Sequence, residues 1–355
     1  MQTEIIHITD VTASAEDIRR AAAVIRDGGL VVFPTETVYG LGGNGLSAEA
    51  ATKIYAAKGR PSDNPLIIHV AKPCDASLYT TPSHSAWTLY EKLARAFMPG
   101  PLTVILPKAT NVPYSTTGGL DTVAVRCPSH PVAHALIEAA ELPIAAPSAN
   151  LSGKPSPTEA EHVIHDLSGR VNMILDGGAC DIGLESTIVK IDEDEDGQAY
   201  LTLLRPGGIT YDALCLVCDR VEVARAVSEQ LAADEKPLSP GMKYRHYAPS
   251  APLVLLDGNP SDVLAFLQAR QAVESCAILC YDEEVSHLAP GQLLPIGPRA
   301  DVAAHAHYLF GKLREADSLV PAPDVIYAHL PDMNGLGLAL YNRMIRAAAH
   351  TVLRV

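Results

Sequence analysis

KGRPSDNPLIIHV, residues 58–70, joins the end of a helical pattern to a short apolar strand and thereby indicates the fold class. Pro61 and Pro65 do not fit inside a helix, so they hold an irregular loop between the two elements. On both sides of this segment, helix-like and strand-like stretches alternate through residues 1–208. This alternation predicts an α/β domain.

The strand patterns predict a sheet that is mixed rather than wholly parallel. Ser14 and Ser47 are placed to precede helices, Thr158 with Glu161 reads as a capping box, and further helices are expected at 84–97 and 131–141. The last two strand patterns are too close for a crossover helix, which predicts a hairpin. Strands are expected at 4–9, 30–35, 66–70, 102–106, 122–126, 172–176, 186–191 and 200–204.

The length of 355 residues suits two domains. We expect a catalytic domain at 1–208, a connection at 209–252 that contains SPGMKYRHYAP, and a small C-terminal domain at 253–355. Three strand patterns alternate with helices in the last part, which predicts a parallel α/β sheet. It has no Gly-x-Gly-x-x-Gly after its first strand, so a dinucleotide is not indicated. The connection reads either as a surface linker or as a strap over the first domain's pocket.

Composition and charge exclude several classes of protein. A net charge of −14 argues against non-specific coating of nucleic acid, so cations must be concentrated locally, as in a pocket for a small anion. The N-terminus lacks a signal-peptide pattern and no apolar run approaches a membrane span, so we expect a cytoplasmic protein with no membrane partner. The seven cysteines indicate reduced thiols. Cys215 and Cys218 lack a second ligand pair, and we expect no metal site.

A group of polar loops and strand ends points to such a pocket. Lys58 and Arg60 repel each other and favour a shared anion, and we treat them as the catalytic candidates; Arg60 is expected to be an exposed loop cation whose replacement by Ala leaves the fold intact. Ser148 and Asn150, in APSANLSGKPSPT, offer small donors and acceptors. Further candidates are the glycine-rich PTETVYGLGGNGL (34–46), TVAVR (122–126), Glu185-Ser186-Thr187 and LLRPGG (203–208).

Other interpretations of these residues stay open at this point. The glycine-rich stretch also fits a plain strand end and turn, His69 also fits a satisfied core residue, and Arg126 also fits a surface salt bridge. The sequence has no Gly-x-Ser-x-Gly elbow and no cysteine flanked by a helix start and a partnering histidine. Cations, hydroxyls and amides without a nucleophile favour direct attack of one bound substrate on the phosphate of another.

The motifs PTETVYGLG, KGRPSDNPLIIHV, PGPLTVIL, TVAVR, PSANLSGKPSPT, GLESTIV and LLRPGG occur in this order, and together they resemble the YrdC-type threonylcarbamoyl-adenylate synthases. SPGMKYRHYAP and the last α/β region resemble the two-domain branch of that family. The resemblance implies a nucleotidyltransferase that makes threonylcarbamoyl-AMP and pyrophosphate from L-threonine, bicarbonate and ATP with Mg²⁺. Its product would serve threonylcarbamoyladenosine modification of tRNA, through downstream tRNA threonylcarbamoyl-transfer proteins and with possible weak tRNA binding by the chain itself.

The resemblance also implies roles for matching residues. Arg126 is the expected partner of the threonine carboxylate, and Ala146 stands where some members have a hydroxyl, so one threonine contact is absent or made by backbone. Tyr244 or Tyr247 would cover the site. The residues implied for ATP are Lys58, Arg60, Asn64, Thr122, Ser148, Asn150, Ser156, Arg205, Tyr244 and Tyr247; those implied for threonine or its carbamate are Thr35, His69, Arg126 and one of Ser186 or Thr187.

Two alternative functions belong to other classes. A non-catalytic module for double-stranded RNA or tRNA would use the same cleft, although the acidic net charge opposes it. A carbamoyl-transfer enzyme is suggested by related domains of hydrogenase maturation factors, but the chain lacks the additional domains of those factors.

Overall fold

The computed structural model describes residues 2–229, 237–239 and 246–355, which form two compact units. The N-terminal unit comprises 2–152, 157–181, 185–229 and 237–239, and the C-terminal unit comprises 153–156, 182–184 and 246–355. Two short segments from within the predicted catalytic domain therefore belong to the C-terminal unit, which sequence patterning does not predict. None of the helices in these described ranges is long and apolar enough to span a membrane.

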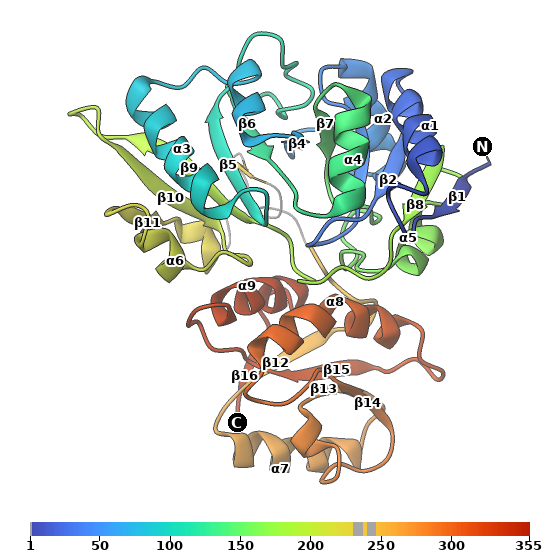
Figure 1. Cartoon of the computed structure of the whole chain (residues 1–355). Coiled ribbons are helices and arrows are strands. Elements are labelled where there is room, and N and C mark those ends of the chain that lie inside the picture. Colours follow the sequence, from blue (N-terminus) through green and yellow to red (C-terminus); the bar gives the residue numbers. More distant parts are fainter. Residues whose placement is uncertain (1, 230–236, 240–245) are drawn as a thin grey trace. The chain divides into compact units, whose positions relative to one another are not determined.

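The N-terminal unit is built on one mixed sheet, labelled in Figure 1. The sheet combines parallel pairs such as β4 with β6 and antiparallel pairs such as β9 with β10, and the predicted hairpin is confirmed. In spatial order the described strands are β1 (Glu4–His7), β8 (Met173–Asp176), β2 (Val31–Phe33), β3 (Gly40–Asn44), β7 (Ile144–Ala146), β4 (Ile67–His69), β6 (Thr122–Arg126), β5 (Leu102–Pro107), β9 (Thr187–Glu193), β10 (Ala199–Arg205) and β11 (Val221–Val223).

Helices of this unit mostly begin where the sequence supplies a cap, but the helices that follow Ser14 and Glu159 have no side-chain cap. The Ser47 hydroxyl accepts a hydrogen bond from the Ala50 amide at the start of α2, as predicted. The capping box at Thr158 is wrong, because the helix begins after Glu159 and no side chain caps it. The helices of this unit are α1 (Ala15–Arg26), α2 (Ala48–Lys58), α3 (His84–Phe97), α4 (Pro131–Ala140), α5 (Ala160–Leu167) and α6 (Tyr211–Cys215), with 3₁₀ turns at Pro73–Leu78 and Arg225–Val227.

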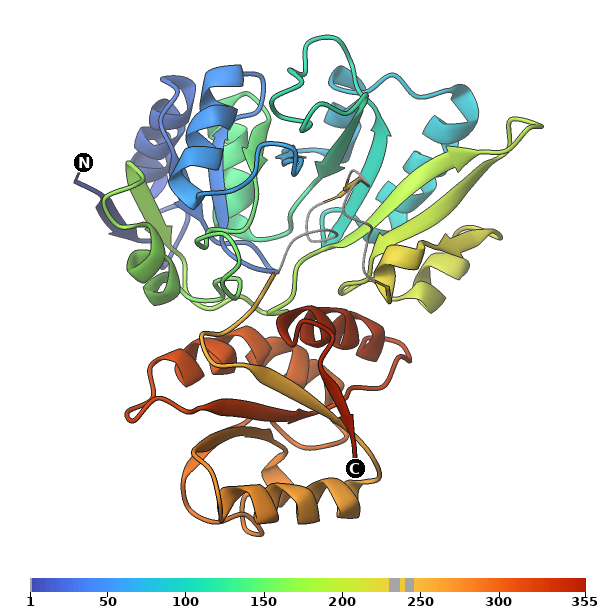
Figure 2. The same ribbon diagram turned by 180° about the vertical axis from the view of Figure 1, so that it is seen from behind.

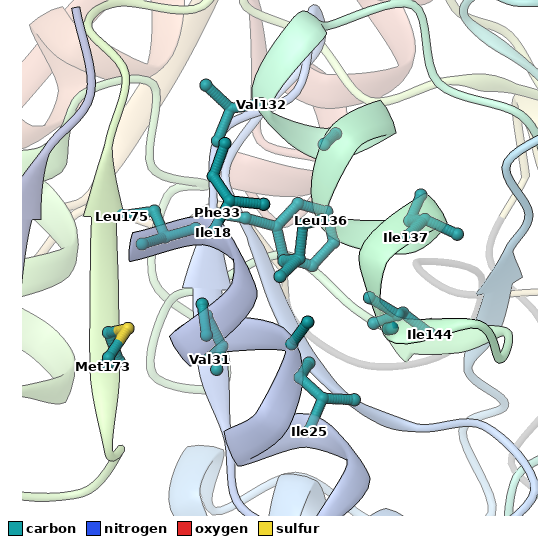
Figure 3. Close-up of a cluster of buried hydrophobic side chains, with 14 of the residues drawn as sticks. Ile18, Ile25, Val31, Phe33, Val132, Leu136, Ile137, Ile144, Met173 and Leu175 are labelled. Carbon is teal, nitrogen blue, oxygen red and sulfur yellow. The ribbon is translucent and has the colours of Figure 1, made fainter. Parts of the chain in front are cut away.

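Helices cover both faces of the sheet. Figure 3 shows α1 and α4 packed over β2, β7 and β8, with Phe33 and Leu136 inside the cluster. A Cβ on Gly42 would meet Phe33 and Ile144 on that face, whereas one on Gly43 would meet Ile54 of α2. Because successive residues of a strand face opposite sides, α2 lies on the other face. Glycine lets both faces approach β3 closely, which explains why a strand forms where the sequence suggested a turn.

The C-terminal unit is a smaller, wholly parallel sheet with helices on both faces (Figures 1 and 2). The helix α7 packs on one face through Val263 and Leu267, and α8 and α9 lie on the other. Its strands in spatial order are β14 (Gln292–Pro295), β13 (Cys276–Cys280), β15 (Val325–His329), β12 (Leu253–Asp257) and β16 (Val352–Arg354); its helices are α7 (Pro260–Gln271), α8 (Val302–Asp317) and α9 (Gly337–Ala347), with a 3₁₀ turn at Asp282–Glu284.

The structure extends the predicted elements at several places. The C-terminal sheet gains β14 and β16 beyond the three predicted strands, and β3, β7 and β11 join the N-terminal sheet. Part of the predicted connection at 209–252 is regular structure, since α6 and β11 form there. The strand β11 is held by parallel pairing with the edge of β10, a contact between segments that local sequence patterns do not reveal.

Candidate active site

A row of side chains crosses five neighbouring strands on one face of the N-terminal sheet. His69 of β4 is paired with Arg126 of β6, Arg126 with Thr103 of β5, Thr103 with Ile188 of β9, and Ile188 with Arg205 of β10. Paired residues of adjacent strands point to the same face. His69 is also paired with Ile144, so the row continues the face on which α1 and α4 pack.

Hydrogen bonds tie the far end of this row together. The Thr103 and Ser186 hydroxyl oxygens lie 2.7 Å apart, and the Arg205 guanidinium donates to the Ser186 hydroxyl and carbonyl oxygens at 3.2 and 3.0 Å. Ser186 and Arg205 therefore stand at the same end of the sheet as Arg126. Thr187 does not take part in these contacts. Its hydroxyl donates to the Ile209 carbonyl oxygen and accepts from the Ile209 amide.

A second polar group gathers at the opposite end of β4. Lys58, the last residue of α2, donates to the Ser148 and Asn150 carbonyl oxygens, and its side-chain nitrogen lies 3.2 Å from the Asn150 amide oxygen. The Ser148 hydroxyl lies 2.6 Å from the same amide oxygen. Gly59 adopts a left-handed conformation with φ 62°, which ends the helix and turns the chain toward Arg60.

Arg60 is buried, with 8% of its surface exposed, so the expectation of an exposed loop cation is wrong. Its guanidinium donates to the Asn64 and Pro65 carbonyl oxygens at 3.2 and 3.1 Å and thereby folds the loop before β4 around itself. The Asn64 side-chain oxygen is buried and has no hydrogen-bond partner among the described residues. An unsatisfied buried acceptor is costly, and a ligand donor would relieve that cost.

Strand register sorts the predicted residues into two sets. Ile67 is paired with Ala124 and with Ala146, so Thr122, Asn64 and the 148–150 loop lie toward the amino end of β4. His69 and Arg126 mark its carboxyl end, where Ser186 and Arg205 also lie. Because a strand rises about 3.3 Å per residue, the two sets are separated by on the order of 10 Å.

Apolar side chains occupy the sheet between the two sets. Ile67, Ala124 and Ile105 are paired across β4, β6 and β5, and they pack with Ile188 and with Ala226 of the 3₁₀ turn. A site with polar groups at both ends and an apolar floor suits a ligand that carries charge at its ends. Ala146 of β7 lies in the α1–α4 core cluster, and its side chain brings no hydroxyl to the site.

Burial and charge keep the groups at the carboxyl end in defined protonation states. Burial and the neighbouring Arg126 charge lower the pKa of His69 to about 3, so its imidazole is neutral near pH 7. Burial is the largest single effect and would raise the pKa of Glu36, but the Arg126 guanidinium and the Glu36 and Ser129 backbone amides together outweigh it and hold that pKa below its usual range. Burial raises the pKa of the Cys180 and Cys127 thiols to about 12. Neither thiol is poised as a thiolate nucleophile.

Two residues of this site were not predicted from the sequence. Glu36 lies 2.8 Å from Arg126, with 7% and 5% of the two side chains exposed, and Thr103 joins Ser186. Both lie in quoted motifs, PTETVYGLG and PGPLTVIL, but only the pairing of distant strands shows that they meet Arg126 and Ser186. The Thr35 hydroxyl accepts hydrogen bonds from the Thr37 and Val38 amides and so holds the turn that carries Glu36.

The remaining predicted site residues are not among the described residues of the N-terminal unit. Ser156 and Tyr247 belong to the C-terminal unit, where the Tyr247 ring stacks on Phe310 with ring centroids 5.1 Å apart. Tyr244 lies outside the described residues. Cys215 is exposed and Cys218 is buried. Over the ranges that the structure describes, no group of three metal-ligating side chains comes together.

Comparisons with known proteins agree with this architecture. A family model covering Sua5, YciO and YrdC, described as "Telomere recombination", matches residues 23–207, and one described as "Threonylcarbamoyl-AMP synthase, C-terminal domain" matches residues 209–349. The chain is 44% identical to the threonylcarbamoyl-AMP synthase of Bacillus subtilis, over 98% of each protein. It is 43% identical to that of Pyrococcus abyssi, over 95% of this chain and 96% of the other.

Solved structures extend the likeness to the whole fold. The crystal structure of P. abyssi Sua5 complexed with L-threonine matches with a TM-score of 0.88 and 40% identity, and each chain is covered completely. The structure of a doubly substituted P. abyssi Sua5 matches with a TM-score of 0.90, covering 100% of this chain and 98% of the other. The chain therefore belongs to the Sua5–YciO–YrdC family, in the two-domain form that carries the threonylcarbamoyl-AMP synthase C-terminal domain.

Proposed function

We propose that the chain is a nucleotidyltransferase that makes threonylcarbamoyl-AMP and pyrophosphate from L-threonine, bicarbonate and ATP. The observation that carries the proposal is the two-ended site along β4, with the Lys58 group at one end and the His69–Arg126 row at the other. Membership of a family whose relatives are named threonylcarbamoyl-AMP synthases supports the activity. The threonine complex of the P. abyssi protein supports threonine as one substrate.

The two ends suit different parts of the reactants. Arg126 has buried donors without hydrogen-bond acceptors among the described residues, and these fit the carboxylate of threonine. Neutral His69 beside it can accept or donate a hydrogen bond without adding charge. At the other end, the Asn64 amide and the loop held by Lys58 offer polar groups to a nucleotide. Arg205 and Ser186, at the Arg126 end, are placed to meet developing negative charge.

The proposed reaction depends on the positioning of the two substrates rather than on covalent catalysis. The threonine ammonium group first loses a proton to solvent, and the neutral amine and bicarbonate then form a carbamate with loss of water. A carbamate oxygen next attacks the α-phosphorus of ATP. The bond from the α-phosphorus to the bridging oxygen breaks, and pyrophosphate leaves with that electron pair. Direct attack by the bound carbamate needs no covalent enzyme intermediate, and the raised pKa of the Cys180 thiol fits this route. Burial of the reacting groups protects the carbamate and the acyl-adenylate from water.

Mg²⁺ belongs to this proposal as part of the ATP substrate. Since no three-ligand cluster is found within 2–229, 237–239 and 246–355, the phosphates of ATP would provide most of its ligands. The ion would offset charge on the leaving pyrophosphate. We further propose that the protein acts in the cytoplasm and supplies the labile product to tRNA threonylcarbamoyl-transfer proteins.

The test is a reconstitution with purified protein, ATP, Mg²⁺, L-threonine and bicarbonate. Pyrophosphate should appear only when all components are present, and mass spectrometry should detect threonylcarbamoyl-AMP. ATP consumption that does not depend on threonine would overturn the proposal. A salt titration of tRNA binding tests the RNA-module alternative, because tight and steeply salt-dependent binding without turnover would favour it.

A further inference from the structure

Glu36 and Arg126 form a buried ion pair whose hydrogen-bonding groups are only partly used. Glu36 Oε1 and Arg126 Nη2 lie 2.8 Å apart, yet the pair is not aligned as a hydrogen bond. Arg126 Nε and Nη2 and Glu36 Oε1 are all buried without a hydrogen-bond partner among the described residues. The contact is therefore one of charge, and two donors and one acceptor remain to be satisfied.

The position of Glu36 is fixed from two sides. Its Oε2 accepts a hydrogen bond from the Ser129 amide at 3.2 Å, which ties the loop after β2 to the loop after β6. The Thr35 hydroxyl organises the turn from the other side. Arg126 keeps Glu36 ionised despite burial, since it lowers the pKa of that carboxyl. Two oppositely charged groups are thus held at the carboxyl end of β4, beside neutral His69.

Stability gives no sufficient reason for such a pair. The cost of removing two charges from water offsets most of their attraction, so well-packed apolar residues would serve the fold as well. An ion pair that is neutral overall, with a buried acceptor next to buried donors that lack hydrogen-bond partners among the described residues, has a different use. It complements a molecule that carries an anionic acceptor and a cationic donor on the same carbon atom.

We propose that Glu36 is a specificity-determining and positioning residue, which holds Arg126 and selects a zwitterionic α-amino acid over a carboxylate that lacks the amine. The ligand carboxylate takes the donors of Arg126, and its ammonium group meets Glu36. An amine-free acid would bring a second carboxylate to the Arg126 guanidinium that already faces Glu36, without an ammonium group to offset the added negative charge. This inference rests on the proposed function, because it concerns the threonine end of the same site.

The experiment compares Glu36→Gln, which removes the charge but keeps an oxygen for the Ser129 amide, with Glu36→Asp, which keeps the charge. Glu138→Gln on the exposed side of α4 is the control. Calorimetry with the full-length protein measures binding of L-threonine and of 2,3-dihydroxybutyrate, its amine-free analogue. Steady-state pyrophosphate release separates the KM for threonine from the KM for ATP, and thermal unfolding confirms that each variant is folded.

Wild type should bind threonine at least about a hundredfold more tightly than the analogue, as expected where a site pairs with a group that the analogue lacks. Glu36→Gln should weaken threonine binding about tenfold or more and narrow that preference, while the KM for ATP stays within about twofold. Glu36→Asp should recover part of the preference, and Glu138→Gln should resemble wild type. A purely structural role would move both KM values together or neither.

Two results would overturn the inference, and they are distinct from failure of the proposed function. Folded Glu36→Gln protein that binds threonine as wild type does would remove Glu36 from substrate selection. Equal affinity of wild type for threonine and for the amine-free acid would also overturn the inference. This result needs no variant, so it holds even if Glu36→Gln does not fold. If wild type bound no threonine and released no pyrophosphate, the proposed function itself would fail, and the inference with it.

Discussion

His69 and Arg126 end two neighbouring parallel strands and are paired in register, so a cationic guanidinium lies beside a buried imidazole. Burial, assisted by the Arg126 charge, lowers the pKa of His69 to about 3. The His69 Nδ1 atom lies 3.2 and 3.3 Å from the Ile67 and Ile144 carbonyl oxygens, which fits a proton on Nδ1 and leaves Nε2 as an acceptor. The neutral imidazole thus adds no positive charge beside the Arg126 guanidinium.

This relationship predicts a pH dependence of stability. The unfolded chain binds a proton at His69 near its ordinary pKa of 6.5, whereas the native state binds it only near pH 3. The contribution to stability is therefore full above about pH 6.5 and is lost as the pH falls toward 3, at up to about 1.4 kcal/mol per pH unit. Urea unfolding of wild type and His69→Gln from about pH 4 to pH 7 should show a steeper decline for wild type.

The comparison isolates His69 because other histidines are unchanged. Burial also lowers the pKa values of His130, His305 and His350, and these contribute equally to both proteins. Parallel curves for wild type and His69→Gln would contradict the assignment of a neutral, buried imidazole.

Lys58 is expected to stabilise the loop at 148–150 as well as the nucleotide end of the site. Its ammonium group donates to the Ser148 and Asn150 carbonyl oxygens, so Lys58→Met leaves buried acceptors without a donor. We expect the free energy of unfolding to fall by on the order of 3 kcal/mol and the KM for ATP to rise. Chemical denaturation and pyrophosphate release measure the two effects.

Lys53→Met is the matched control on the same helix. Its side chain is 45% exposed and pairs with Glu49, so its replacement should change the unfolding free energy by less than about 1 kcal/mol. If the two substitutions changed the unfolding free energy equally, the buried contacts of Lys58 would add no more stability than the exposed ion pair of Lys53.

Arg60 should matter for folding as well as for turnover. Arg60→Ala removes a donor to the Pro65 carbonyl oxygen and one of the donors to the Asn64 carbonyl oxygen, which also accepts from the Tyr55 hydroxyl. We expect a loss of about 1–3 kcal/mol of stability together with loss of pyrophosphate release. Arg60→Lys keeps the charge but not the planar fork, so it should recover stability only in part. Unfolding free energies equal to wild type in both variants would contradict the buried position.

Gly207 sits where the chain after β10 passes close to the backbone of Glu185, Ser186 and Thr187. A Cβ there would lie 2.6 Å from the Glu185 carbonyl oxygen and 2.7 Å from the Ser186 carbonyl carbon, so Gly207→Ala must displace backbone next to Arg205. We expect destabilisation of at least about 2 kcal/mol and a marked loss of activity. Thermal unfolding and the pyrophosphate assay check both.

Gly311, within α8, is the control for the chemical change. Nothing lies within 4 Å of a Cβ at that position, so Gly311→Ala should stabilise the protein by about 0.5–1 kcal/mol through helix propensity. Similar effects at the two positions would argue against the close approach at Gly207.

The order of motifs in the sequence was enough to predict that some polar residues far apart in the chain come together. Lys58 and Ser148 are far apart in the chain, but cations and small hydroxyls on loops between regular elements already indicated an anion pocket, and the structure brings these two residues into contact. The mixed sheet, the hairpin and the parallel C-terminal sheet were also predictable, because strand and helix patterns and connection lengths are local properties.

What could not be predicted depends on pairing between distant segments. The strands β3, β7 and β11 are short or rich in glycine and are specified by their neighbours. The same holds for Glu36, whose role follows from its contact with Arg126, and for Arg60, whose burial follows from the way its own loop wraps around it.

By itself the sequence determined which chemical groups are present and on which kind of element each stands, because residue type, spacing and turn residues act locally. Only the tertiary structure decided which groups share a face and an end of the sheet, and which charges are buried together. Register across β4, β6 and β5 places Arg126 between His69 and Thr103, and the loop after β2 brings Glu36 to it. Those contacts set the pKa values, and they depend on distances that no local pattern encodes.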